Sequence, residues 1–324
     1  MRSQNSVSVL AAAALLVAGL ALWPASADAA EKADLDAGKA IDFRLAPDLD
    51  MGEAGGKPSR FLVRLYGGYG RIAAGDLNEG LDGYYELIEF YAAEGYGTVT
   101  GGYSPLKAGY NFGADFIYQI SPKIGVGLGV GYMRNSRSSL ATWTGEGDID
   151  LPGTAALSAV PIRLGLFVTL PLGQKLNLTA DAGAAYYAAL KFDATQRIEF
   201  NEADWQEMSL SASRSSFANI GFQGSLGLEY MVTSKMGLFV EALGRYASFK
   251  NFETATGSNR NSGGFSESTE GKIYLMTYAF DDFVWSMFTV EETPPVSTPP
   301  SKIYTEPKID LSGFSLQAGF RIRF

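Results

Sequence analysis

Runs that alternate apolar residues with small or polar residues, at a period of two, dominate this sequence. The clearest is IGVGLGVGY, where apolar residues from Ile124 to Tyr132 alternate with four glycines. Eight such runs occur, at 61–70, 110–118, 124–132, 160–170, 176–187, 219–230, 236–246 and 313–324. Each is about ten residues long, the length that a tilted β-strand needs to cross a bilayer. We therefore expect an all-β fold built from eight strands.

Short and long connections alternate between these runs. Tight turns are indicated at 120–123, 171–174 and 233–235, where Ser, Pro, Gly and Thr interrupt the pattern. Long segments, at about 75–106, 136–156, 191–213 and 251–308, lie between the turns. This order is typical of an eight-stranded antiparallel up-and-down transmembrane β-barrel with short periplasmic turns and long extracellular loops.

The N-terminus has the features of a secretory signal. Arg2 precedes an apolar run from Val7 to Leu22, and small residues suited to cleavage follow between Ala25 and Ala29. A membrane anchor helix is the alternative, although the run falls short of the roughly 20 residues that a spanning helix needs. We expect a cleaved signal at 1–29, a periplasmic arm at 30–59 and the barrel at 60–324.

Composition excludes several classes of function. The chain has no cysteine and no histidine, and its net charge is −9. It therefore lacks a thiolate nucleophile, disulfides, and the commonest general base and transition-metal ligand. The acidic balance argues against nucleic acid as a partner, because phosphate binding requires basic patches. We expect a protein with no enzymatic activity, no cofactor and no metal site.

The last eight residues, QAGFRIRF, carry the most specific resemblance. Gln317, Gly319, Ile322 and Phe324 match the C-terminal assembly signal of bacterial outer-membrane proteins. From about residue 60 onward the chain resembles the small eight-stranded barrels of the OmpA, OmpX and OmpW type. The resemblance implies a location in the outer membrane of a Gram-negative cell envelope. It also implies contact with outer-membrane lipids and lipopolysaccharide, and delivery to the barrel assembly machinery through the C-terminal strand.

The face of each run that would point into the barrel carries nearly balanced charge. The inward charged residues are Arg64, Asp115, Arg163, Asp181, Glu229, Glu241, Arg245, Arg321 and Arg323. An eight-stranded barrel is just wide enough for its own side chains, so buried charges there must be paired. We interpret these residues as an ion-paired plug; a gated pore lined by the same residues is the alternative.

The expected loops are acidic and aromatic. The spacing of Tyr84, Leu87, Ile88 and Tyr91 predicts a short amphipathic helix. A candidate binding surface in the loops comprises Tyr84, Tyr91, Tyr274, Tyr278, Phe283, Trp285 and Phe288. Loop hairpins that pack on the barrel rim are an alternative, and two more barrel strands at 273–280 and 283–290 are another.

Two functions fit this sequence. The first is a non-enzymatic barrel with a structural or surface-interaction role through its extracellular loops. The second is a porin-like or OmpW-like channel for small or hydrophobic solutes. The sequence identifies neither a ligand nor a partner at the cell surface.

Overall fold

The structure, a computed structural model, describes residues 60–145, 147–200, 203–280, 283–299 and 301–324. The predicted signal (1–29) and arm (30–59) lie outside the described residues. The elements are β1 (Phe61–Gly75), α2 (Leu77–Ala93), β2 (Thr98–Gly102), β3 (Ala108–Gln119), β4 (Ile124–Thr144), β5 (Asp148–Pro171), β6 (Leu176–Glu199), β7 (Trp205–Arg214), β8 (Ile220–Met231), β9 (Met236–Tyr246), β10 (Ser248–Phe249), β11 (Thr254–Asn261), β12 (Ser266–Phe280), β13 (Phe283–Glu291), β14 (Lys302–Thr305) and β15 (Ile309–Arg323).

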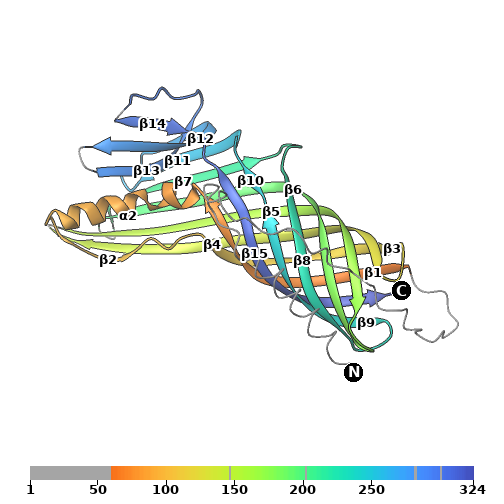
Figure 1. The fold of residues 1–324 in the computed structure, drawn as a ribbon. Helices are drawn as coiled ribbons and strands as arrows, with labels where there is room; N and C mark the ends of the chain where they lie inside the picture. The colour runs from red at the N-terminus through yellow and green to blue at the C-terminus, as the bar shows by residue number, and fades with distance from the viewer. Residues whose placement is uncertain (1–59, 146, 201–202, 281–282, 300) are drawn as a thin grey trace, which may run out of the picture. The chain divides into compact units, whose positions relative to one another are not determined.

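Eight of these strands form a closed ring of hydrogen bonds. Their order is β1, β3, β4, β5, β6, β8, β9 and β15, and β15 pairs back to β1 (Figure 1). Every pairing in the ring is antiparallel, and the closing pair runs from Leu62↔Arg323 to Gly75↔Ile309. The predicted eight-stranded antiparallel ring is confirmed. Closure leaves no free strand edge, which is the condition for a sheet to lie in hydrocarbon.

The alternating pattern sorts side chains between the two faces of the ring. On β1, Leu62 and Arg64 are buried inside, whereas Phe61 and Leu65 are exposed on the outer surface. This follows from strand geometry, because successive side chains point to opposite faces. The outer face is therefore apolar, and the inner face carries the charged residues.

Tight turns join β3 to β4, β5 to β6 and β8 to β9. In the first, the Ser121 hydroxyl accepts a hydrogen bond from the backbone N–H of Ile124 at 3.1 Å. In the third, the Thr233 hydroxyl accepts one from the N–H of Met236 at 3.0 Å. Short hydroxyl side chains stabilise turns in this way by supplying an additional acceptor for a backbone N–H.

The expectation of loops at 136–156 and 191–213 is wrong. β4 and β5 stay paired as far as Thr144↔Asp148, and β6 pairs with β7 from Leu190↔Arg214 to Glu199↔Trp205. In these segments the outer face carries charged and hydroxyl side chains such as Lys191 and Ser209. The inner face carries apolar ones such as Phe192 and Leu151, so the apolar-outside pattern of the ring is reversed. The backbone ladder nevertheless continues, because each strand has a hydrogen-bonding neighbour.

The other two expected loops also hold regular structure. The predicted helix near residues 84–91 is confirmed as α2. Segments 273–280 and 283–290 are strands, in β12 and β13, but neither enters the ring. β12 pairs instead with β11, β13 and β14. A ten-stranded barrel is thereby excluded.

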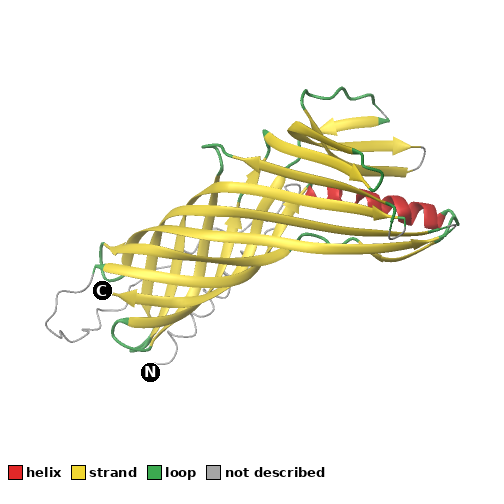
Figure 2. Ribbon diagram, turned by 180° about the vertical axis from the view of Figure 1, so that it is seen from behind, coloured by secondary structure: helices red, strands yellow, loops and turns green. Residues whose placement is uncertain are grey.

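We call the region beyond the ring the head. It comprises α2, β2, β7, β11–β14 and residues 136–144, 148–157 and 190–199 of β4, β5 and β6. Figure 2 shows α2 lying along the sheet of the head. The rings of Phe90 on α2 and Phe283 on β13 stack with centroids 4.4 Å apart.

The largest buried apolar cluster lies where the ring strands continue into the head. It includes Ile72, Met133, Leu157, Tyr187 and Leu311, each from a different ring strand. Apolar packing therefore closes the interior on the head side of the ring. In the described part of the chain, no helix is long and apolar enough to cross a membrane.

Candidate ion-paired lumen and head cavity

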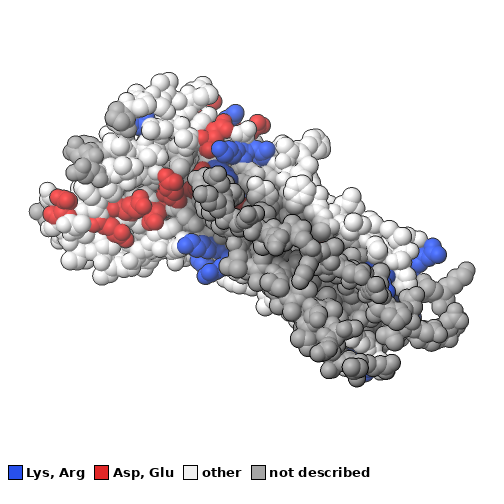
Figure 3. Space-filling view, in the orientation of Figure 1, with Lys and Arg blue, Asp and Glu red and all other residues white. Residues whose placement is uncertain are grey.

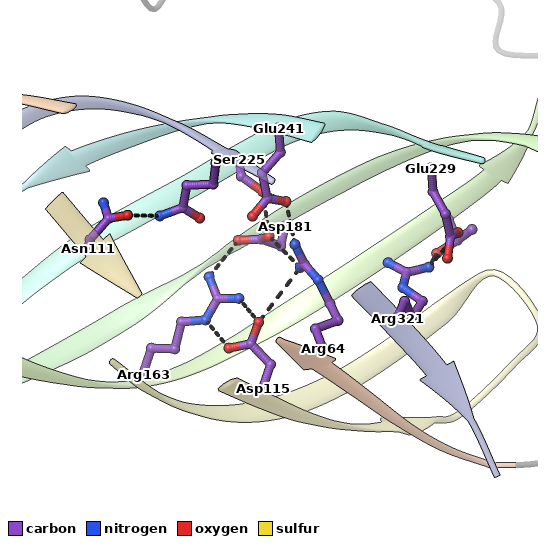
Figure 4. Close-up of polar contacts among 11 residues, drawn as sticks. Arg64, Asn111, Asp115, Arg163, Asp181, Ser225, Glu229, Glu241 and Arg321 are labelled. Carbon is purple, nitrogen blue, oxygen red and sulfur yellow. Dashed lines mark hydrogen bonds and ion pairs between the residues drawn. The ribbon is translucent and has the colours of Figure 1, made fainter. Parts of the chain in front are cut away.

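Two arginines and three carboxylates form a buried cluster inside the ring (Figure 4). Arg64 pairs with Glu241, with Asp181 at 3.3 Å and with Asp115 at 3.8 Å. Arg163 donates from Nε to Asp115 at 2.8 Å and from Nη1 to Asp181 at 3.2 Å. Arg64 is 1% exposed and Asp115 0% exposed. Each charge in this central cluster therefore has an opposite charge in place of water.

Hydroxyl and aromatic groups complete the surroundings of the central cluster. The Ser225 hydroxyl lies 2.5 Å from Asp181 and 3.1 Å from Glu241, so it can donate to either carboxylate. The Arg64 guanidinium lies 4.3 Å from the centroid of the Phe239 ring. Cation–π contacts of this kind help a desolvated cation.

Strand register explains why the central cluster forms. Arg64 lies directly opposite Asp115 on the neighbouring strand. Gly129 lies between Asp115 and Arg163 in the same row. A Cβ at Gly129 would meet the Asp115 carboxylate at 2.2 Å and the Arg163 side chain at 2.8 Å. The glycine thus provides the space in which these two side chains meet across β4.

A second buried cluster is centred on Glu229. Arg321 donates to Glu229 at 2.9 Å, Arg323 lies 3.8 Å from it, and the Asn177 amide donates to it at 2.9 Å. Arg321 also donates to the Thr169 hydroxyl at 3.1 Å. The central cluster has one excess acid and this cluster one excess base. Together their formal charges cancel.

Arg245 stands apart from both clusters. It is half-buried, and its Nε donates to the backbone carbonyl of Leu311 at 3.0 Å. Within the described residues it makes no ion pair. The structure therefore brings eight of the nine inward charged residues into two clusters and leaves Arg245 outside them.

A neutral network of buried amides and a hydroxyl lies on the same inner face. Asn111 donates to the Ser315 hydroxyl at 2.9 Å, and Gln317 donates to the Asn111 side-chain oxygen at 3.2 Å. Sequence reasoning missed Asn111, Ser315 and Ser225 because it considered only charged residues. Their inward positions in the alternating pattern were the available signal.

The four residues of the C-terminal motif lie in the closing strand or just after it. Gln317 belongs to the neutral network, and a Cβ at Gly319 would meet the Leu65 carbonyl oxygen at 2.0 Å. Ile322 pairs with Val63 on β1. Phe324 is exposed, and its backbone N–H donates to the Phe61 carbonyl at 3.2 Å. The motif therefore lies where the ring closes.

The seven aromatic residues proposed as a loop surface do not form one exposed surface. Most of them pack α2 against the sheet of the head. Trp285 contacts Tyr84 and Tyr278, Phe283 stacks on Phe90, and Phe288 contacts Phe192. Tyr274 is buried, and Tyr91 alone among the seven is exposed. Most of these rings therefore pack inside the head and are not available as a binding surface.

A cavity of about 360 Å³ lies in the head between α2, the sheet and β13. Leu81, Tyr84 and Tyr85 of α2 line one side, and Met208 and Leu210 of β7 line another. The Tyr85 hydroxyl donates to the Leu151 carbonyl at 3.2 Å. Burial raises the pKa of this hydroxyl, so it remains a neutral donor. The volume and mixed lining are in the range of small-molecule sites.

Charge is unevenly distributed over the head. Figure 3 shows acidic side chains gathered over α2, which carries Glu79, Asp82, Glu86 and Glu89. Burial and the nearby carboxylates of Glu86 and Glu89 raise the pKa of Asp82 to about 6. No group of three or more potential metal ligands converges among the described residues.

Comparison with known proteins places the chain in a family. The model of the outer membrane protein beta-barrel domain matches residues 54–266, which is more than half of the chain. The protein belongs to this family of outer-membrane β-barrels. The resemblance and the outer-membrane location inferred from sequence are confirmed.

Solved structures were also compared. The solid-state NMR structure of outer membrane protein AlkL in DMPC lipid bilayers is 14% identical, over 86% of this chain and 97% of that one, with a TM-score of 0.29. The crystal structure of a Pseudomonas aeruginosa FadL homologue is 7% identical, over 82% of this chain and 90% of that one, with a TM-score of 0.14. A search of curated proteins gives no significant match.

Proposed function

We propose that this protein is a closed, non-enzymatic outer-membrane barrel that interacts with its surroundings through the head. The observation that carries the proposal is the central cluster of Arg64, Asp115, Arg163, Asp181 and Glu241. An open water-filled lumen would hydrate these side chains. Instead they are almost fully buried against one another and against the rings of Phe167 and Phe239.

The energetics favour a plug over a pore. An eight-stranded barrel has an interior just wide enough for its own side chains. Opening a path would separate several buried charges from their partners, and breaking one buried pair costs about 3–5 kcal/mol. The apolar cluster around Leu157 and Tyr187 adds a second barrier on the head side.

The orientation follows from the connections between ring strands. The turns at 120–123, 172–175 and 232–235 lie at one end of the ring, and the head continues from the other end. In outer-membrane barrels the short turns face the periplasm. We therefore assign the head to the cell exterior, and the first residues of β1 and the last residues of β15, which lie at the turn end of the ring, to the periplasmic side. The C-terminal motif of Gln317, Gly319, Ile322 and Phe324 then stands where assembly machinery could engage the closing strand.

A channel for small or hydrophobic solutes is the second candidate function. The cavity of about 360 Å³ in the head is compatible with it, since a solute bound there would lie at the head side of the ring. The same cavity equally suits a protein that binds a small molecule without passing it. Lumen conduction distinguishes the two functions.

Conductance of the refolded protein in a planar bilayer tests the proposal. We expect silence from the wild type and from a variant in which residues 252–306 are replaced by a two-residue turn. A general porin added afterwards should give steps and thereby show that the bilayer is competent. Discrete steps from the wild type, or steps that appear when the head is shortened, would overturn the closed barrel and favour the channel.

A further inference from the structure

The outer face of the ring strands changes character in a fixed order along β4. Val130 and Tyr132 are followed on the same face by Arg134, Ser136 and Ser138. The apolar side chains belong to the lipid-facing band, and tyrosines are typical of its rim. Cationic and then hydroxyl side chains therefore begin where the band ends.

Hydroxyl groups continue sideways from Ser138 across six strands. Strand pairing places Ser138 opposite Thr154, which is opposite Thr195. The same row continues with Ser209, Ser258 and Ser268 on β7, β11 and β12. We call this row the hydroxyl ladder. Neighbouring strands lie about 4.8 Å apart, so the ladder is a regular array of small polar groups.

The hydroxyl ladder is open to a partner. Its members are exposed or half-exposed. Ser268 donates to the Gly257 carbonyl at 3.3 Å. In the described part of the chain, the other five side-chain hydroxyls make no hydrogen bond.

Arg134 stands between the lipid-facing band and the ladder on this face, and Arg137, at an alternate position of β4, lies beside Ser138. Arg134 and Arg137 are both exposed, and neither forms an ion pair within the described residues. Arg137 donates to the hydroxyl of Tyr69, a ring of the outer surface, at 3.3 Å. The guanidinium of Arg137 is therefore held at the outer rim. Lys191 lies in the row of Arg134 but is paired with Asp193 at 2.9 Å.

A groove of about 480 Å³ marks the same place. It is lined by Arg134 and Arg137 together with Ser136, Ser138, Thr154 and Thr195, and also by Asp193, whose carboxylate is paired with Lys191. Cations and hydroxyls thus meet in one depression beside the membrane band. Unpaired guanidinium groups suit phosphate, and rows of hydroxyls suit sugars.

We propose that this face binds a phosphorylated glycolipid of the outer leaflet, with its phosphate at Arg134 and Arg137 and its sugars along the hydroxyl ladder. The acyl chains would then lie against the apolar band that continues from this face. The order of apolar, cationic and hydroxyl groups matches the order of acyl chain, phosphate and saccharide in lipopolysaccharide. This inference rests on the assignment of the head to the cell exterior.

Binding of three lipids to the full folded chain in detergent tests the proposal. The probes are lipopolysaccharide with a complete core, lipid A without the core, and phosphatidylglycerol. We expect affinity to fall in that order. Equal affinity for phosphatidylglycerol and lipopolysaccharide would overturn the proposal, because charge alone would then explain binding.

The phosphate-binding role of the arginines is tested with Arg134→Ala/Arg137→Ala. We expect a loss of roughly fivefold to tenfold in affinity for both lipopolysaccharide and lipid A. The matched control is Arg60→Ala/Lys235→Ala, which removes two exposed charges at the other end of the ring, where Arg60 also donates to a tyrosine hydroxyl, that of Tyr118. Equal losses in the two pairs would overturn the phosphate site.

The hydroxyl arm uses Thr154→Val/Thr195→Val, which keeps side-chain shape and strand propensity. We expect roughly threefold to tenfold weaker binding of lipopolysaccharide and unchanged binding of lipid A. Thr269→Val, on the opposite face of β12, is the control and should change neither affinity. Unchanged lipopolysaccharide affinity in the double variant would overturn the sugar-binding role.

The outcomes separate this inference from the proposed function. A gel shift between boiled and unboiled samples establishes that each variant is folded, and Arg134→Gln/Arg137→Gln repeats the test of the arginines with longer side chains. A conducting wild type would refute the closed barrel without changing these affinities. Conversely, if none of the substitutions at Arg134, Arg137, Thr154 and Thr195 changed the lipid affinities, the glycolipid surface would be refuted and the closed barrel would not be affected.

Discussion

At the scale of single residues, Arg64 makes the most ion pairs of any residue in the central cluster. It contacts Asp115, Asp181 and Glu241, which come from three other ring strands. Removal of one partner from a buried ionic cluster leaves the others desolvated and unpaired. The stability of the ring should therefore depend on this side chain more than on any exposed arginine.

Arg64→Met keeps most of the volume and removes the charge. We expect the free energy of unfolding to fall by about 3–5 kcal/mol, measured by urea titration in lipid vesicles. Arg71→Met is the matched control on the same strand, because Arg71 is exposed, and it should change stability by no more than about 0.5 kcal/mol. Equal unfolding curves for the two variants would show that the cluster does not stabilise the ring.

Asp82 gives the head a pH dependence. Its pKa is raised to about 6, first by burial and then by Glu86 and Glu89. The folded state thus disfavours the charged form, and the unfolded state ionises first, near 3.8. The packing of α2 should therefore be strongest below about pH 4 and weaken as the pH rises toward 6. Since Asp82 is partly exposed, solvent screening makes the effect modest.

Hydrogen-exchange protection of the α2 amides, corrected for intrinsic rates, measures this dependence. Protection in the wild type should decrease between pH 4 and pH 7. In Asp82→Asn the decrease should be smaller, because this carboxyl no longer titrates. The control is Glu94→Gln, which removes an acid at the exposed C-terminal end of α2. Its protection profile should be the same as that of the wild type. The same profile in Asp82→Asn and wild type would contradict the assignment to Asp82.

At the scale of elements, α2 is held in place by close contact with β13. A Cβ at Gly83 would lie 1.8 Å from the Ser286 carbonyl oxygen. In an isolated helix, Gly→Ala stabilises by up to about 1 kcal/mol. Here the backbone clash opposes that gain, because a buried carbonyl cannot move without its strand.

Gly83→Ala should therefore loosen the head despite its better helix propensity. We expect a change in Trp285 fluorescence, since this ring packs on Tyr84, and lower exchange protection in α2 and β13. The control is Gly147→Ala, because a Cβ there has no neighbour within 4 Å. Greater protection of α2 in Gly83→Ala would mean that propensity outweighs the contact.

The element scale also explains which strands the sequence could predict. Ring strands such as 124–132 pair an apolar outer face with small or polar inner positions, so their alternation is visible. In segments 136–156 and 191–213 the outer face carries hydroxyl and charged side chains in place of apolar ones, and the apolar side chains lie on the inner face. Each segment folds back as a hairpin whose strands are close in sequence, with Thr144 opposite Asp148 and Glu199 opposite Trp205. They were missed because strands were recognised by an apolar outer face, which these segments lack.

At the scale of the whole molecule, the inward charges could be predicted from the sequence but their partners could not. Arg64 and Glu241 are inward by alternation, yet they meet only because β1 and β9 lie in one closed ring. Closure and register bring together residues 177 positions apart. For the aromatic residues the sequence suggested an exposed binding surface. In the folded head, side chains such as Trp285 are instead partly buried against other rings.

The ring and the later part of the head are separable in the topology. β10 pairs with β15 through Ser248↔Asp310 and Phe249↔Ile309. The segment 250–308 therefore begins and ends at neighbouring positions, next to the paired residues Phe249 and Ile309. None of β11 to β14 contributes a pairing to the ring. A two-residue Asn-Gly turn suits antiparallel strands at such a junction.

Replacement of residues 252–306 by Asn-Gly should therefore leave a folded barrel. We expect the boiled and unboiled protein to migrate differently on a detergent gel, as for the wild type, with a lower melting temperature because Phe252 and Ile273 leave the apolar cluster. Gly319→Leu should abolish the shift, since its side chain would collide with the Leu65 carbonyl where β1 meets β15. If the shortened chain also lost the shift, the ring would depend on the head, and the two could not be treated as separate units of folding.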